Sequence, residues 1–338
     1  MKQILMYLGL FMTISCYKGD DCPQMDNTKM NGVSWVSSNT IINSSHIQPV
    51  VDVEANYSAL IPFAFLPALN STEIQYNVNN QWWGETEDGI RATAQLFKNA
   101  GIKRLLKPQI WVLGGKFVGH IKMDSEAEWI AFEKKYTEYI LFYAQIAEDE
   151  KIEAFSIGTE LKTVILDRPD YWSELIEEVR KVYSGELTYA ANWDSYQNPN
   201  FWEKLDFIGI DAYFPLSDQK TPTIEEIETA WNPIKKDIRK IALKTDKPVV
   251  FTEYGYRSVD FTALEPWEGS HSIVNLKAQE NAIQGLYNTF WNEPWFKGGF
   301  LWKWFDKHET AGGIENNRFT VQNKPSEDLV KKWYKKFK

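Results

Sequence analysis

The segment Ala154-Phe155-Ser156-Ile157-Gly158-Thr159-Glu160 is a short apolar run that ends in a carboxylate. It is one of eight apolar runs in the chain, and segments with helical periodicity separate them. The other seven cover residues 32–37, 57–66, 103–111, 188–193, 207–213, 248–254 and 299–304. Short buried strands that alternate with helices are typical of repeated βα units and a parallel sheet. Eight such units predict an α/β protein with a single-domain (β/α)8 barrel, or TIM barrel, over residues 31–338.

The lengths of the loops indicate which end of the barrel carries the site. Segments after the predicted strands are long, as at residues 67–85, 112–124, 257–276 and 305–326, whereas residues 99–101 form a brief turn before a strand. Two predicted capping boxes, Ser125 with Glu128 and Thr223 with Glu226, mark the starts of helices between strands. Because barrel enzymes place their active sites at the C-terminal ends of the strands, we expect the functional residues there.

Charge and composition narrow the class of ligand. The chain has 37 Lys and Arg against 46 Asp and Glu, which gives a net charge of −9. This balance disfavours nucleic acid and anionic membranes as electrostatic partners and favours a neutral ligand. Aromatic residues make up 15% of the chain, with 15 Trp, 16 Tyr and 19 Phe. Most of these rings are expected in the core, and those at strand ends and in loops are candidates to stack on sugar rings.

The N-terminus has the layout of an export signal. Residues 1–15 combine an early Lys2 with an apolar run and a small residue before Cys16, and the segment is too short to span a bilayer. Thr13-Ile14-Ser15-Cys16 resembles the lipobox of bacterial lipoproteins, although Thr13 departs from the usual aliphatic residue. We therefore expect lipidation at Cys16, a linker over residues 16–30, and an exported protein anchored at the bacterial cell surface or in the periplasm.

The two cysteines leave little scope for thiol chemistry. Lipidation of Cys16 would leave Cys22 alone, so neither a structural disulfide in the barrel nor a cysteine-based site is expected. A bridge between Cys16 and Cys22 is the alternative if no lipid is added.

Two glutamates lie at the C-terminal strand ends, where the active site of a barrel enzyme is expected. Glu160 ends the fourth predicted strand, and Glu253 follows the apolar run 249–252 on the seventh. Either one alone is compatible with a salt-bridged or solvent-facing strand end. Together, on strands that face each other across a barrel, they form the carboxyl pair that glycoside hydrolysis needs, with one ionised and one protonated.

The motifs around these glutamates resemble those of glycoside hydrolase family 113, the β-mannanases of clan A. The resemblance covers the whole barrel and rests on Ile157-Gly158-Thr159-Glu160-Leu161, Phe251-Thr252-Glu253-Tyr254-Gly255-Tyr256, Gly209-Ile210-Asp211-Ala212-Tyr213-Phe214-Pro215 and Leu106-Lys107-Pro108. It implies a retaining mechanism with Glu160 as general acid/base and Glu253 as nucleophile, acting on β-1,4-mannan, glucomannan or manno-oligosaccharides. Thr159 replaces the Asn that many clan A enzymes carry before the acid/base, which leaves the contact to the sugar 2-hydroxyl unassigned.

Further strand-end residues are candidates for substrate binding, each with a scaffold role as the alternative. Tyr213 is a candidate hydrogen-bond donor to the nucleophile, and Trp302 or Trp304 a candidate floor of the subsite where the bond is cleaved. The remaining candidates near the bond are Lys107, Thr159, Asn192, Trp193, Asp211 and Tyr254. Aromatic side chains on or beside the long loops are candidates for distal subsites, and these are Trp82, Trp83, Trp111 and Trp267.

Other functional classes find less support in the sequence. The four histidines lack metal-ligand spacing, and the Gly pairs at 114–115 and 312–313 lack the spacing of a phosphate loop, so no metal and no cofactor are expected. The Gly-x-Ser-x-Gly motif of serine hydrolases does not occur in the sequence. The alternatives that remain are an exo-acting β-mannosidase, a β-glucanase or a transglycosylase on the same barrel, and a non-catalytic glycan-binding lipoprotein. The substrate specificity of these enzymes depends on loop geometry, which the sequence pattern does not specify.

Overall fold

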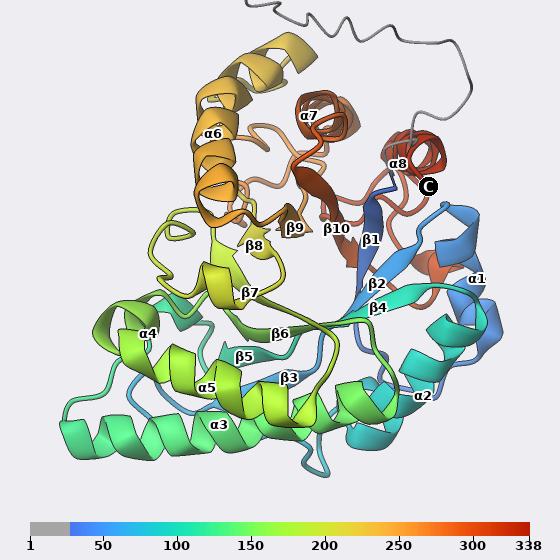
Figure 1. Cartoon of the computed structure of the whole chain (residues 1–338). Coiled ribbons are helices and arrows are strands. Elements are labelled where there is room, and N and C mark those ends of the chain that lie inside the picture. The colour runs from blue at the N-terminus through green and yellow to red at the C-terminus, as the bar shows by residue number, and fades with distance from the viewer. Residues whose placement is uncertain (1–27) are drawn as a thin grey trace, which may run out of the picture.

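The strands of the protein close into a barrel that helices surround, as the computed structural model shows (Figure 1). The structure describes residues 28–338. The predicted signal segment, Cys16 and most of the predicted linker lie outside the described residues. The barrel order is β1-β10-β9-β8-β7-β6-β4-β2, and every neighbouring pair is parallel. The prediction of a (β/α)8 barrel is therefore confirmed.

The barrel strands follow the apolar runs of the sequence closely. They are β1 (Met30–Trp35), β2 (Tyr57–Leu60), β4 (Lys103–Leu106), β6 (Ala154–Thr159), β7 (Glu186–Asn192), β8 (Ile208–Asp211), β9 (Val249–Tyr254) and β10 (Phe296–Trp304). The helices are α1 (Ser44–Asp52), α2 (Glu87–Asn99), α3 (Glu126–Asp149), α4 (Lys162–Asp167), α5 (Pro169–Val182), α6 (Ile224–Thr245), α7 (Leu276–Phe290) and α8 (Pro325–Lys336).

Two of the predicted strands are interrupted by proline. Residues 57–66 split into β2 and β3 (Phe63–Leu66) around Pro62, and residues 103–111 split into β4 and β5 (Gln109–Val112) around Pro108. Proline lacks the backbone N–H that a continuous ladder requires. The outer halves β3 and β5 pair with each other in a separate parallel sheet. Residues of both β3 and β5 line the cavity described below.

The fifth βα unit differs from the predicted pattern. In the described part of the chain, no α-helix connects β7 to β8, and the only helical turn there is the 3-10 segment η3 (Trp202–Lys204). Trp202 is buried and donates from its indole nitrogen to the carbonyl of Tyr196, 3.0 Å away. A packed aromatic loop thus covers the barrel where a helix was expected.

The predicted helix caps are present, with one difference in detail. At α6, Thr223 and Glu226 form the reciprocal capping box, with each side chain bound to the other residue's backbone N–H. At α3, Ser125 accepts from the N–H of Glu128, but the Glu128 carboxylate accepts from the N–H of Asp124 at 3.0 Å. Both arrangements satisfy N–H groups that a helix start leaves without partners.

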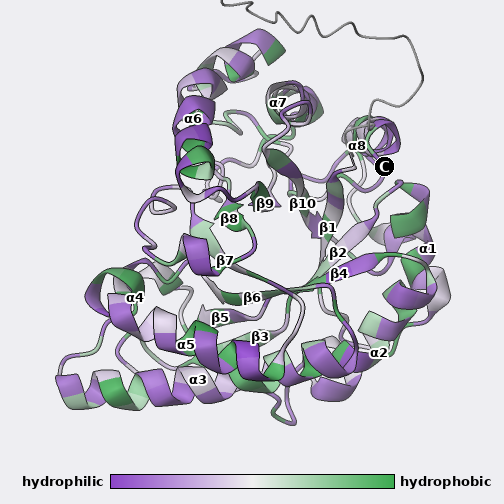
Figure 2. Ribbon diagram, in the orientation of Figure 1, coloured by the Kyte–Doolittle hydropathy of each residue, from purple (hydrophilic) through white to green (hydrophobic). Residues whose placement is uncertain are grey.

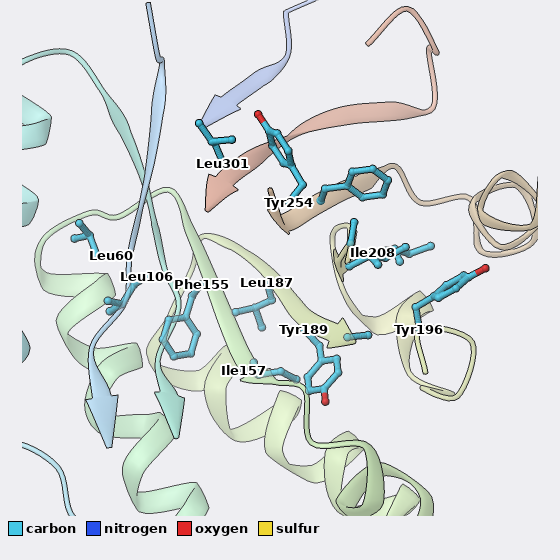
Figure 3. Close-up of a cluster of buried hydrophobic side chains, with 14 of the residues drawn as sticks. Leu60, Leu106, Phe155, Ile157, Leu187, Tyr189, Tyr196, Ile208, Tyr254 and Leu301 are labelled. Atoms are coloured by element: carbon cyan, nitrogen blue, oxygen red, sulfur yellow. The ribbon is translucent and has the colours of Figure 1, made fainter. Parts of the chain in front are cut away.

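The hydrophobic core has two parts because strand residues alternate between the two faces of the sheet. Side chains such as Phe155, Ile157 and Leu187 point outward into the layer between strands and helices (Figure 3). A smaller cluster with Leu105, Val250 and Phe300 fills the barrel interior. Figure 2 shows hydrophilic and hydrophobic residues alternating along the helices, as expected of helices with one buried face. Between residues 28 and 338, no helix combines the length and apolar character needed to cross a bilayer.

Candidate active site

A cavity of about 650 Å³ opens at the C-terminal ends of the barrel strands. Its lining comes from β3, β5, β6, β7, β9 and β10 and from the loops that follow β5 to β10, as the loop lengths predicted. The polar side chains in the lining include Gln109, Thr159, Glu160, Asn192, Asp194 and Glu253, and the rings include Trp111, Phe117, Trp193, Tyr213, Trp267, Trp302 and Phe319.

Glu253 is held by hydrogen bonds to both of its carboxylate oxygens. It lies on β9 opposite Asp211 of β8, which is itself opposite Asn192 of β7, so the three residues share one level of the barrel. Its Oε1 accepts from the Lys107 ammonium and from Nε2 of Gln109 at 2.6 Å, and its Oε2 accepts from the Tyr213 hydroxyl at 2.8 Å. These three donors orient a carboxylate that is only 6% exposed.

A buried ion cluster lies behind Glu253. Lys107 and Asp211 are both fully buried, and the Lys107 ammonium lies 3.2 Å from each Asp211 oxygen. Thr252 donates its hydroxyl to Oδ1 of Asp211 at 2.7 Å. Burial, and then the charge of Glu253, raises the pKa of Asp211 to about 7 although Lys107 opposes the shift. Burial by itself would lower the pKa of Lys107, but Asp211 and Glu253 outweigh it and the net change is upward.

Glu160 stands directly after β6, where the strand ends. Its φ is 56°, in the left-handed region that costs a non-glycine residue about 1 kcal/mol or more. Its N–H donates to the carbonyl of Ala190 on β7 at 2.8 Å, which connects this turn to the barrel. The side chain lines the cavity. Burial, and then the charges of Asp211 and Glu253, raises the pKa of Glu160 well above its usual value, because a second or third negative charge in one low-dielectric site is unfavourable.

The aromatic side chains form two walls of the cavity. Trp193, after β7, stacks on Trp267 of the β9–α7 loop with ring centroids 5.3 Å apart and planes at 15°. On the β3–β5 side, Trp111 packs edge-on against Phe63 at 6.3 Å. Trp111 and Trp267 remain 50% and 46% exposed, so both keep free surface for a ligand.

The structure brings many of the predicted site residues together in this cavity. Glu160, Glu253, Thr159, Asn192, Trp193, Tyr213 and Trp302 all line it, and so do two of the four distal candidates, Trp111 and Trp267. The expected hydrogen bond from Tyr213 to Glu253 is present.

Lys107 and Asp211 are placed differently from the prediction. Both were candidates for substrate binding, Lys107 for sugar hydroxyls, but both are fully buried behind Glu253 and absent from the cavity lining. Their charges pair with each other and with Glu253, so they support that carboxylate instead of contacting a ligand. A lone buried charge would be costly, and the pairing accounts for the position of both.

Tyr254 and Trp304 lie in the scaffold, which was the alternative to substrate binding for both. Neighbouring residues on a strand face opposite sides, so Tyr254 points away from the cavity and its hydroxyl hydrogen-bonds Tyr287 and Tyr334 of the helix layer. Trp304 is fully buried in the outer core although Trp302 lines the cavity. The pairing of β10 with β1 shifts register before Trp304, which breaks the two-residue alternation that placed both rings on one face.

Two of the distal candidates also lie elsewhere. Trp83 is partly buried and packs against the outer core. Trp82 is 53% exposed, but it is absent from the cavity lining. Both belong to the long loop 67–86, whose path the sequence pattern did not specify.

Sequence reasoning missed several residues of the cavity. Gln109 lies two positions after Lys107 within the predicted strand 103–111, so the period-2 rule applied to that strand could have identified it. Phe117 and Phe319 come from loops without periodic pattern, and nothing in the sequence distinguished them from other loop aromatics.

A parallel barrel with two carboxyls in one aromatic-walled cavity, one of them favoured as the protonated acid, defines a glycoside hydrolase. The family model of glycoside hydrolase family 113 matches residues 39–324, and the chain belongs to this family. No curated protein shows significant similarity to the chain.

Solved structures of this family share the fold over nearly their whole length. A β-mannanase of family 113 from Alicyclobacillus acidocaldarius, solved in complex with ManMIm, is 25% identical, with a TM-score of 0.82 over 92% of this chain and 98% of that one. Another β-1,4-mannanase of family 113 is 26% identical, with a TM-score of 0.77 over 92% of this chain and 99% of that one. A β-glucuronidase from Faecalibacterium prausnitzii, 14% identical with a TM-score of 0.63, shares the barrel fold over 92% of this chain and 49% of its own.

Proposed function

We propose that the protein is a retaining glycoside hydrolase that cleaves β-1,4-mannosidic bonds in mannan, glucomannan or manno-oligosaccharides. The observation that carries this proposal is the unequal environment of two carboxyls in one cavity. Glu253 accepts hydrogen bonds at both oxygens, whereas burial and neighbouring negative charge raise the pKa of Glu160. The substrate class rests on the family and on the β-mannanases among its solved structures.

These environments assign the steps of a double displacement. The Glu253 carboxylate attacks the anomeric carbon while the glycosidic C–O bond breaks, and Glu160 gives its proton to the leaving oxygen. Glu160, now ionised, removes a proton from water as that water attacks the anomeric carbon. The bond between the anomeric carbon and Glu253 breaks as the water oxygen attacks, so the Glu253 carboxylate is released and the sugar leaves with its original anomeric configuration. Tyr213, Gln109 and Lys107 keep the attacking carboxylate in place throughout.

Product mapping tests the activity and its mode. Reduced manno-oligosaccharides, glucomannan, cellulose and xylan would be incubated with the protein, and the products separated by length. Internal cuts in mannan support the proposal, single-mannose release indicates an exo-acting β-mannosidase, and longer products indicate transglycosylation. Cleavage of cellulose alone indicates a β-glucanase. No release from any β-linked glycan would refute the enzyme assignment and leave a glycan-binding protein.

Azide rescue tests the roles of the two glutamates. Glu253→Ala should abolish hydrolysis, and azide should restore turnover with a glycosyl azide of inverted configuration, because azide then replaces the nucleophile. Glu160→Ala should cleave only activated aryl glycosides and form a glycosyl azide of retained configuration. Interchanged products would show that the roles are reversed.

We also propose that the protein is exported and lipid-anchored through Cys16, from the lipobox-like segment 13–16. The test is labelling with radioactive palmitate in a bacterial host, followed by fractionation. The label should be present in the full chain and absent from Cys16→Ser. Equal labelling of both would contradict the proposed anchor.

A further inference from the structure

Four cations gather around the loop that follows β10. Arg257, Lys303, Arg318 and Lys324 form no salt bridge with any carboxylate among residues 28–338, although the chain has a net charge of −9. The Arg257 guanidinium donates to the carbonyl of Glu268 at 3.1 Å. The Lys303 ammonium lies over the rings of Trp302 and Phe305, at 5.3 and 5.4 Å from their centroids.

Hydrogen bonds of Lys324 connect the loops that carry Arg257 and Arg318. The Lys324 ammonium donates to the carbonyl of Arg318 at 2.8 Å and to the hydroxyl of Ser258 at 2.9 Å, so it joins the loop after β9 to the loop after β10. Burial, and then the charge of Arg257, lowers the pKa of Lys324 to about 7. Burial, and then the charge of Arg318, lowers the pKa of Arg257.

The cluster borders the catalytic cavity. Trp302 and Phe319 line the cavity, whereas Lys303 and Arg318 lie next to them outside the lining, with the Lys303 ammonium 5.3 Å from the centroid of the Trp302 ring. Phe319 packs edge-on against Tyr213, with ring centroids 6.0 Å apart. Burial lowers the pKa of Lys303; the negative charge of Glu253 opposes this shift, and the positive charge of Arg318 adds to it. Lys303 is partly exposed and Arg318 is exposed, so a ligand can reach both.

We propose that Lys303 and Arg318 form an anion-binding subsite at the Trp302–Phe319 wall, for a carboxylate, sulfate or phosphate group carried by the β-linked glycan. This inference rests on the proposed function, because it assigns a substituent to the substrate of the same cavity. Cations without carboxylate partners repel one another, and a bound anion relieves that repulsion. Arg257 and Lys324 reinforce the positive potential from behind, against the negative charge of the whole chain.

The test compares substrates that differ only in charge. Manno-oligosaccharides of equal length would be used unmodified, oxidised at C6 to carboxylates, or O-sulfated, and kcat/KM would be measured for each. The wild-type protein should prefer one or both acidic forms, and which one it prefers identifies the anion. Lys303→Met and Arg318→Gln should each reduce the ratio of acidic to neutral kcat/KM about fivefold, the effect of a partly exposed ion pair. Salt should reduce the same ratio in the wild type.

Two further variants make the result specific. Arg318→Glu, a charge reversal at an exposed position, should make the neutral substrate the better one. Lys307→Gln removes an exposed cation from the same loop and should leave the ratio unchanged. Equal ratios in the wild type, Lys303→Met and Arg318→Glu would overturn the subsite while mannan hydrolysis, and with it the proposed function, still stands.

Binding to an inactive variant separates the two proposals in the opposite case. Calorimetry with Glu253→Gln measures affinity for the same oligosaccharides without turnover. If the wild type cleaves no mannan but this variant binds the acidic forms in a salt-sensitive manner, the proposed function fails and the subsite stands. If neither cleavage nor a preference for acidic forms is found, both fail.

Discussion

Replacing Asp211 with asparagine should change how the stability of the protein depends on pH. The pKa of Asp211 is raised from 3.8 to about 7, so between these values the folded state binds a proton that the unfolded chain has lost. The contribution of Asp211 to the free energy of unfolding therefore falls as the pH rises through this interval. For this fully buried group, the change in pKa corresponds to a change of about 4 kcal/mol in the free energy of unfolding.

Asp211→Asn keeps the shape of the side chain and removes its titration. The amide retains one oxygen for Thr252 and Lys107 but loses one of the two 3.2 Å contacts to the ammonium, which should cost about 1–3 kcal/mol at every pH. In addition to this constant difference, the free energy of unfolding of the variant should rise by about 4 kcal/mol relative to that of the wild type as the pH increases from about 4 to about 8.

Urea unfolding followed by tryptophan fluorescence, at intervals over this range, measures the difference directly. Asp218→Asn, at an exposed position, is the matched control and should give a curve parallel to that of the wild type. If the curves for Asp211→Asn and the wild type are also parallel, Asp211 does not titrate near neutrality. The conclusion that burial and Glu253 outweigh Lys107 in setting the pKa of Asp211 would then be wrong.

Three other substitutions test the site and the packing. Tyr213→Phe removes the 2.8 Å hydrogen bond to Glu253 and should lower kcat about 10- to 100-fold, the value of a bond to a charged group, and unchanged kcat would contradict its role. Tyr254→Phe should leave kcat/KM for manno-oligosaccharides unchanged and lower the free energy of unfolding by about 1 kcal/mol, because the Tyr254 hydroxyl bonds to tyrosines of the helix layer. A raised KM would show that Tyr254 binds substrate after all. Gly32→Ala places a Cβ 2.4 Å from the Phe300 ring inside the barrel and should destabilise the protein by about 1–3 kcal/mol in thermal or urea unfolding, whereas wild-type stability would show that the ring moves aside.

Much of the fold could be predicted because the barrel is built from local patterns. Each strand has to bury an apolar run, and each helix has to bury one face, so the alternation of the two is visible in the chain. The breaks at Pro62 and Pro108 were also present in the sequence, since proline cannot continue a ladder. The missing helix of the fifth unit was not predictable in this way, because Trp202 and its neighbours cover the barrel through tertiary packing alone.

The sequence by itself determined that Glu160 and Glu253 stand at the ends of strands, because strand position follows from the order of apolar and polar residues. The tertiary structure alone decided what surrounds them. It moved Lys107 and Asp211 from candidate substrate contacts to a buried ion cluster, and it turned Tyr254 and Trp304 into the core. Charge pairing and burial depend on distances between segments far apart in the chain. No pattern of neighbouring residues specifies those distances, because closure of the barrel sets them.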